Sequence, residues 1–154
     1  MAKHGWIRWT LGVLGAAVAV AGGVAYARFR RDLKAARARM DAVPHETVET
    51  AMGPVTVATW GEGEIPVLSV HGIMGGYDQG IMLAQGWLDP AQFRVIAPSR
   101  FGYPGTPMPE GEGLPDAQAD AFAALLDALD VDRVGVVATS AGGTSALQFA
   151  LRHP

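Results

Sequence analysis

The feature that most constrains this chain is a short apolar run ending in a serine between small residues, Val134-Gly135-Val136-Val137-Ala138-Thr139-Ser140-Ala141-Gly142-Gly143. The β-branched residues before the serine favour a strand. The alanine- and leucine-rich segment 144–152 has the composition of a helix. A strand, a tight turn with serine at its apex and a helix are together typical of a nucleophile elbow. We therefore expect Ser140 to be a catalytic nucleophile.

Small residues on both sides of Ser140 are what such a turn requires. The serine adopts a strained backbone conformation that few non-glycine residues accept, and the flanking strand and helix pass close together. Ala138 and Gly142 occupy the flanks, with alanine standing where glycine is usual. We expect any side chain larger than a methyl group at either position to block this approach. The helix start behind Ser140 would offer free N–H groups and a positive dipole end to developing negative charge.

The N-terminal part has a different character. Residues 9–27 are uncharged and just long enough to cross a bilayer as a helix, after a short tail of residues 1–8. Aromatic residues, which prefer the headgroup region, flank this stretch: Trp6, Trp9 and Tyr26. The stretch is either a retained transmembrane helix or a cleaved signal peptide, for which Ala25-Tyr26-Ala27 would supply the small-x-small cleavage site.

A cluster of positive charges follows directly, formed by Arg28, Arg30, Arg31, Lys34, Arg37 and Arg39. Such a cluster opposes translocation and favours a single-pass membrane anchor with a cytoplasmic globular part. The signal-peptide alternative would export that part. Apolar residues recur at helical spacing within 28–44, which predicts a basic juxtamembrane helix or linker. It either lies against an anionic membrane face or is a solvated helix that Pro44 ends.

Charge and cysteine content narrow the function classes. The formal net charge is −3, and no field of one sign covers residues 45–154, so we expect no nucleic acid as a partner. The expected membrane partner is lipid, through the N-terminal stretch. The absence of cysteine excludes disulfides and thiol metal sites. Gly61-Glu62-Gly63-Glu64 is predicted to be a loop, because the G-x-G-x-x-G dinucleotide fingerprint is absent.

Strand and helix patterns alternate through the globular part. Residues 47–50 and 55–60 predict a hairpin, and the apolar runs 66–70 and 93–97 predict buried strands. Pro115 and Asp116 open a helix with one apolar stripe, formed by Phe122, Leu125, Leu126 and Leu129. This order predicts βαβ units and an α/β fold with a mostly parallel sheet.

A glycine-rich loop follows the strand expected at 66–70. His71-Gly72 opens it and further glycines follow. In an elbow enzyme this loop supplies one backbone donor of the oxyanion hole, and the residue after the serine supplies the other. The residue after the serine in this chain is Ala141. We expect His71 to brace this loop by hydrogen bonds rather than to act as the base.

Other polar residues near these motifs are expected to stabilise the structure rather than to take part in the reaction. Asp78 is expected to cap the following helix rather than to line a pocket. Arg100 is expected to tie down its own loop rather than to touch substrate. Three acids on the polar side of the helix that begins at Pro115 are expected to be solvated surface charges, namely Asp120, Asp127 and Asp130.

Residues 45–154 resemble the N-terminal part of an α/β-hydrolase domain, in particular the bacterial esterase-like and peroxidase-like members. The motifs that carry the resemblance keep the family's order and spacing: His71-Gly72, Tyr77-Asp78-Gln79-Gly80, Ser99-Arg100-Phe101-Gly102-Tyr103 and Ser140-Ala141-Gly142-Gly143. The resemblance implies that Ser140 attacks a small-molecule ester or similar acyl substrate. It also implies that the N–H groups of Ala141 and of Ile73 or Met74 hold the oxyanion. It implies no metal and no organic cofactor.

The sequence also departs from the family. The family's triad runs serine, acid, histidine along the chain, whereas His153 is the one histidine after Ser140. A helix would place it more than about 15 Å from the serine. We therefore expect a sheet truncated after the elbow helix, with the triad acid and histidine absent and activity weak or lost. The alternatives are a non-catalytic, membrane-tethered α/β-fold interaction protein and, less favoured, an anion-binding loop at 71–80.

Overall fold

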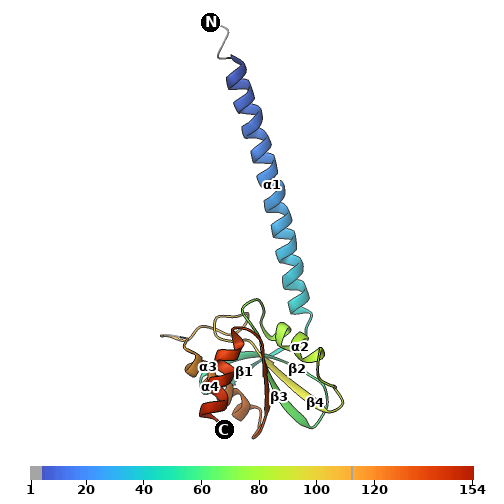
Figure 1. The fold of residues 1–154 in the computed structure, drawn as a ribbon, viewed down its shortest axis with the longest axis vertical. Coiled ribbons are helices and arrows are strands. Elements are labelled where there is room, and N and C mark those ends of the chain that lie inside the picture. Colours follow the sequence, from blue (N-terminus) through green and yellow to red (C-terminus); the bar gives the residue numbers. More distant parts are fainter. Residues whose placement is uncertain (1–4, 112) are drawn as a thin grey trace. The chain divides into compact units, whose positions relative to one another are not determined.

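The structure is a computed structural model that describes residues 5–111 and 113–154. The chain divides between Ala42 and Val43 into two compact units. The first unit contains one helix, α1 (Gly5–Asp41), which runs without a break through the stretch 9–27 and on to residue 41 of the stretch 28–44 that the sequence distinguishes (Figure 1). It already begins inside the predicted tail 1–8. Alanine-rich composition explains this continuity, and the helix ends before Pro44, which disfavours helical conformation in the residue before it.

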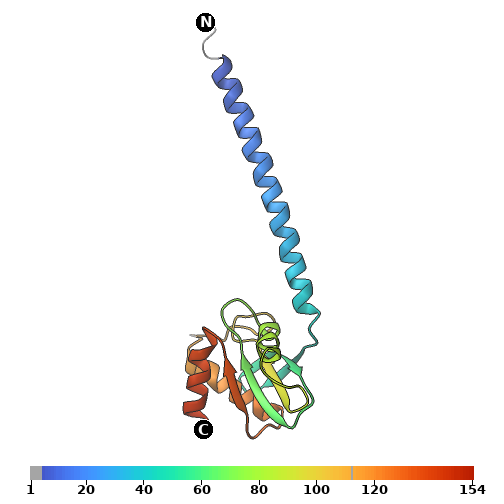
Figure 2. The same cartoon turned by 45° about the vertical axis from the view of Figure 1, so that its right-hand side comes forward.

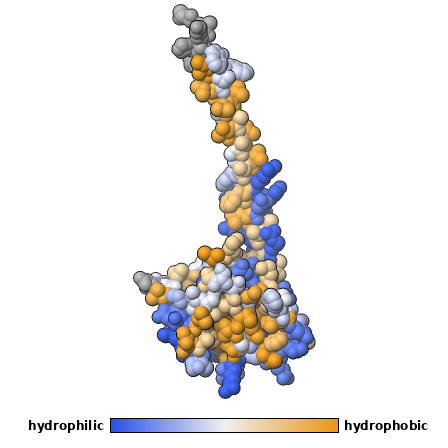
Figure 3. Space-filling model, viewed as in Figure 1, coloured by the Kyte–Doolittle hydropathy of each residue, from blue (hydrophilic) through white to orange (hydrophobic). Residues whose placement is uncertain are grey.

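By length and composition, α1 is able to span a membrane. Its candidate span reaches a mean hydropathy of 1.8, and none of that window is buried within the structure. Apolar surface covers much of the helix, and strongly hydrophilic side chains gather toward its C-terminal part (Figure 3). Thirty-seven residues extend about 55 Å, which exceeds the roughly 30 Å of bilayer hydrocarbon. These properties fit an anchor and a signal sequence equally.

The second unit is built on a five-stranded sheet of order β1-β2-β4-β3-β5. Its strands are β1 (Glu46–Thr50), β2 (Gly53–Trp60), β3 (Ile65–Val70), β4 (Phe93–Pro98) and β5 (Gly135–Ala138). β1 and β2 form the predicted hairpin and β2 pairs antiparallel with β4. β4, β3 and β5 run parallel. The predicted α/β fold is therefore confirmed, and the hairpin makes the sheet mixed.

Helices cover both faces of this sheet (Figures 1 and 2). α2 (Tyr77–Gln85) packs on β2, β3 and β4, with Gly80 close to Ser69 and Ala97. α3 (Pro115–Ala128) and α4 (Gly142–Arg152) pack together on the other face. Because side chains alternate along a strand, Leu68 and Val70 face this second layer while Ser69 faces α2.

The hydrophobic core lies between the sheet and the α3–α4 layer. It joins strand residues such as Val57, Leu68 and Ile96 to the predicted apolar stripe of α3 and to Phe149 of α4. Phe122 and Phe149 meet edge to face with ring centroids 6.3 Å apart. This packing fixes α4, and therefore its N-terminal end, against the sheet.

We expect Leu125→Ala to lower the free energy of unfolding by about 2–5 kcal/mol, because Leu125 is fully buried and its truncation leaves a cavity. Leu151→Ala is the matched control, since Leu151 is 76% exposed and its truncation should change stability by about 0.5 kcal/mol or less. Denaturant unfolding of the full chain in detergent measures both. Equal effects of the two substitutions would contradict the placement of the core.

Candidate active site

The site forms where two neighbouring parallel strands end side by side. Val70, at the end of β3, pairs with Ala138, at the end of β5. The Thr139 N–H donates to the Val70 carbonyl oxygen at 3.1 Å, which extends the pairing by one step. The loop that follows β3 and the turn that follows β5 therefore begin next to each other. In α/β folds, this carboxyl edge of the parallel strands is where ligands bind.

Ser140 stands at the apex of the turn between β5 and α4. Its φ is +49°, in the left-handed region that is unusual for a residue with a side chain. The Gly142 N–H donates to the Thr139 carbonyl at 2.9 Å and the Gly143 N–H to the Ser140 carbonyl at 3.0 Å, which closes the turn. The residue is exposed. The structure thus gives Ser140 the strained, accessible position that the sequence pattern predicts.

Gly142 sets how closely α4 approaches the sheet. A Cβ atom at this position would overlap the backbone carbonyl oxygens of Val70 and His71. The size limit at position 142 is therefore stricter than the methyl group set from sequence, because backbone rather than a movable side chain lies opposite. Ala138, on the other flank, is exposed and accommodates its methyl group.

Gly142→Ala should destabilise the protein by about 1–3 kcal/mol, because α4 must shift away from β3. Gly143→Ala is the matched control one residue later, where an added Cβ meets nothing within 4 Å. That substitution should leave stability unchanged or raise it by up to about 1 kcal/mol through helix propensity. Chemical unfolding measures the free energy of unfolding of the two variants. Equal stabilities would rule out the close contact between Gly142 and the carbonyl oxygens of Val70 and His71.

The glycine-rich loop is held against Ser140 through Gly72. A Cβ at Gly72 would lie 3.2 Å from the Ser140 Cβ. The Gly72 N–H donates to the Gln79 Oε1 at 2.7 Å, and the Gly72 carbonyl accepts from the Arg100 Nη2 at 3.0 Å. Because its N–H is already used, Gly72 is not available as an oxyanion donor. Ile73 and Met74, the two loop donors predicted from sequence, follow Gly72 directly in this loop.

His71 supports this loop from inside the protein. It is fully buried, and its Nε2 accepts the Arg100 N–H at 2.9 Å. The proton is therefore on Nδ1, which donates to the Gly72 carbonyl at 2.7 Å. Burial, more than the nearby Arg100 charge, lowers the pKa of His71 to about 4. A neutral ring with both nitrogens occupied braces the loop and does not act as a base toward Ser140.

Stability should fall as the pH drops from about 6.5 to about 4. The pKa of His71 is lowered to about 4 in the folded protein, so the unfolded chain binds a proton there first. The loss over this window should approach about 3 kcal/mol. His71→Gln should remove this slope although it lowers stability at pH 7.

Unfolding midpoints of the full chain between pH 4 and pH 7.5 measure this effect. The Asp120 carboxyl, whose pKa is lowered from 3.8 by Arg152 and then His153, loses its contribution only below this window. A stability that stays constant from pH 6.5 to pH 4 would disprove the buried, neutral state of His71.

The predicted donors lie in the turn between β3 and α2 and at the start of α4. Ile73 and Met74 have side chains 69% and 88% exposed, and the Ile73 carbonyl accepts the Tyr103 hydroxyl at 3.2 Å. Ala141 is the residue before α4 and so presents its backbone at the positive end of the helix dipole. Arg100 lies over the Tyr103 ring at 4.8 Å, which fits its expected role in tying down the loop.

Two supporting roles differ from the predictions. Gly76, not Asp78, is the N-cap of α2; the Asp78 carboxylate lies in the first turn and accepts the Gly76 N–H at 2.9 Å. The buried Ser99 hydroxyl, reached from β4, instead accepts the Tyr77 N–H at 3.2 Å. Gln79 was given no role from sequence, although it belongs to the 77–80 motif. These contacts join distant segments, which local patterns do not reveal.

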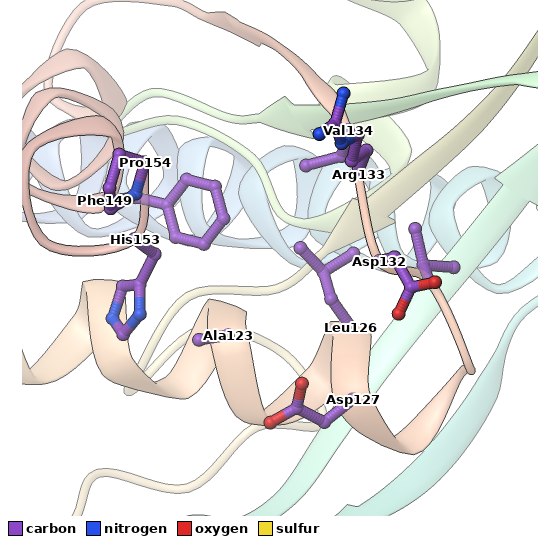
Figure 4. A pocket seen from close by; sticks show the side chains of 10 residues that line it. Ala123, Leu126, Asp127, Asp132, Arg133, Val134, Phe149, His153 and Pro154 are labelled. Carbon is purple, nitrogen blue, oxygen red and sulfur yellow. The ribbon is translucent and has the colours of Figure 1, made fainter.

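A pocket of about 570 Å³ lies away from these residues, between α3, the C-terminal end of α4 and the segment before β5 (Figure 4). At the end of α4, Arg152 and His153 bind the Asp120 carboxylate at 2.7 and 2.9 Å. Asp120 therefore links α3 to α4, a role not predicted from sequence, although its side chain remains 34% exposed at the surface. His153 is committed to this pair, far along α4 from Ser140. Ser140 and the glycine-rich loop do not line this pocket.

Comparison with known proteins agrees with this geometry. Residues 65–154 match the family described as the alpha/beta hydrolase fold. An uncharacterized hydrolase of Bacillus subtilis, YcgS, is 32% identical over 113 residues, covering 71% of this chain and 37% of the relative. An alpha/beta hydrolase fold protein from Nakamurella multipartita superposes with a TM-score of 0.65 at 42% identity, covering 72% of this chain and 37% of that protein.

A third similar protein has a named substrate class. The N-acyl homoserine lactonase AidH, solved with N-butanoyl homoserine, superposes with a TM-score of 0.60 at 26% identity, covering 73% of this chain and 42% of that protein. The present chain thus spans between 37% and 42% of the length of these three proteins. The match of residues 65–154 includes the glycine-rich loop and the turn at Ser140. The chain belongs to the α/β-hydrolase family.

Proposed function

We propose that the protein to which these residues belong is a membrane-anchored serine hydrolase that acts on esters or similar acyl compounds. The observation that carries this proposal is the placement of Ser140. It is exposed at the apex of a strained turn, with the Gly72 backbone directly against it. Strain of this kind persists where the surrounding structure imposes it, and it concentrates at functional sites.

The proposed chemistry follows from the groups around the serine. The Ser140 Oγ attacks the acyl carbon, and the N–H groups of Ala141 and of Ile73 or Met74 stabilise the oxyanion of the tetrahedral intermediate. Expulsion of the alcohol leaves an acyl-serine, which water then hydrolyses. His71 and His153 are engaged elsewhere, and His45 contacts the Val43 carbonyl oxygen and stacks on the Tyr77 ring. We therefore propose that the triad histidine and acid come from outside the described residues. No metal or organic cofactor takes part in this proposal.

The acyl class has one further support. A homoserine lactone is a cyclic ester, and the lactonase named above shares the fold of residues on both sides of Ser140. A hydroxyl nucleophile also suits acyl transfer, because an acyl-serine is itself an ester that water can cleave.

Membrane attachment rests on α1. Its uncharged stretch 9–27 has the length of a span, and the cations from Arg28 onward follow without a gap. We propose that α1 is retained as a single-pass anchor with the catalytic unit in the cytoplasm. Cleavage after Ala27 and export is the alternative, and the size of the mature protein separates the two.

The proposal predicts that a fluorophosphonate probe labels the protein in its native membranes, because such probes react with activated serines. Ser140→Ala should reduce labelling at least 100-fold, the loss expected when a covalent nucleophile is removed. In-gel fluorescence reads the labelling, and the mass of the band reports the length of the chain that carries Ser140.

Thr144→Ala is the control, since its exposed hydroxyl bonds only within α4, to the Ala141 carbonyl at 3.0 Å. This variant should be labelled as strongly as the natural sequence. A native protein that remains folded in the membrane but unlabelled would overturn the hydrolase proposal. The non-catalytic, membrane-tethered interaction protein would then be the better explanation.

A further inference from the structure

The continuity of α1 determines where its positive charges lie relative to a membrane. The helix continues from the uncharged stretch 9–27 into the basic segment with no break at residues 27–28. A basic helix that lies flat on a membrane beside a transmembrane span needs a bend between the two. Because the described helix has none, the basic segment continues along the axis of the span.

Helix geometry then separates the cations by depth. At about 1.5 Å per residue, Arg28, Arg30 and Arg31 lie about 1.5–6 Å beyond the uncharged stretch, within a headgroup layer of roughly 5–8 Å. Arg37 and Arg39 lie about 15–18 Å beyond it. These two therefore lie about 7–13 Å outside that headgroup layer, and because the Debye length at physiological ionic strength is about 8 Å, their attraction to the membrane surface is strongly weakened.

Side-chain direction favours the same three residues. The Cα–Cβ bonds of a helix tilt toward its N-terminus, so arginines that follow the span lean back toward the membrane. At about 100° per residue, Arg28, Arg30 and Arg31 leave the helix in three different directions, as suits a helix surrounded by lipids. Arg30 lies over the Tyr26 ring, 6.0 Å from its centroid, at the level where amphipathic aromatic rings prefer to lie.

The neighbouring charges leave these arginines available. Arg31 pairs with Asp32 at 3.1 Å, but both side chains are mostly exposed, so this pair is weak. Among the ion pairs of the described residues, no other involves this segment. Charge is also divided along the chain: eight of the twelve Lys and Arg residues precede residue 43, against two of the fifteen Asp and Glu residues. The globular unit therefore has four Lys and Arg residues against thirteen Asp and Glu residues and is acidic overall, contrary to the expectation of no prevailing sign, so the basic charge of the chain is concentrated in α1.

We propose that Arg28, Arg30 and Arg31 bind the headgroups of anionic phospholipids at the C-terminal end of the span, while Arg37 and Arg39 do not. This inference rests on the membrane anchoring proposed above. It adds that anchoring selects the lipids around the helix through their charge.

The test compares two double variants with the same charge loss, Arg28→Gln with Arg30→Gln and Arg37→Gln with Arg39→Gln. Each is made in the full chain with a single dye at Ala25→Cys, which is unique because the chain has no cysteine. The protein is reconstituted in phosphatidylcholine vesicles containing a trace of acyl-labelled phosphatidylglycerol or phosphatidylcholine. Energy transfer gives the relative association constant of each lipid.

The natural sequence should prefer phosphatidylglycerol, and high salt should weaken that preference. In the Arg28 and Arg30 variant, the preference for phosphatidylglycerol over phosphatidylcholine should fall about fivefold for each arginine removed. The Arg37 and Arg39 variant should change by about twofold or less, because its charges lie about one Debye length or more outside the headgroup layer. Equal losses in the two variants would overturn the proposal and indicate a basic segment that binds polyanions along its whole length.

Resistance to alkaline extraction from the vesicles separates the two proposals. A chain that is extracted lacks the anchor, and both the anchoring and the lipid preference fail. A chain that resists extraction but shows equal association with both lipids retains the anchor and refutes only the headgroup binding.

Discussion

The arrangement of this protein depends on how closely the start of α4 approaches the end of β3. Gly142 lies against the carbonyl oxygens of Val70 and His71, with no room for a side chain. The core contact between Phe122 and Phe149 holds the body of the same helix. Together these contacts hold the start and the body of α4 and so restrain the turn between β5 and α4. Ser140 takes its left-handed conformation because the packing on either side leaves no other path.

The second part of the site is fixed by hydrogen bonds that converge on one small residue. Gly72 donates to Gln79 and accepts from His71 and Arg100, which come from α2, the loop itself and the loop after β4. Three separate segments thus hold the Gly72 backbone in one position beside Ser140. A site preorganised in this way does not have to rearrange as charge develops on a bound substrate.

The sequence predicts the order and type of the elements well, because each depends on local patterns. The hairpin, the buried strands, the α3 stripe and the turn at Ser140 all follow from periodicity or from short motifs. The supporting contacts could not be predicted in this way. Ser99 with Tyr77 and Asp120 with Arg152 join residues 22 and 32 positions apart, and such pairings depend on how the layers pack.

The position of β5 has a consequence for the nucleophile. This four-residue strand is at the edge of the sheet and pairs only with β3 among the described residues. The backbone amides on its other side lack a strand partner there, and short edge strands open more readily than central ones. Amide hydrogen exchange in β5 is therefore a sensitive gauge of how rigidly Ser140 is held. A segment that paired with the free side of β5 would slow amide exchange in this strand and would also reduce the mobility of Ser140.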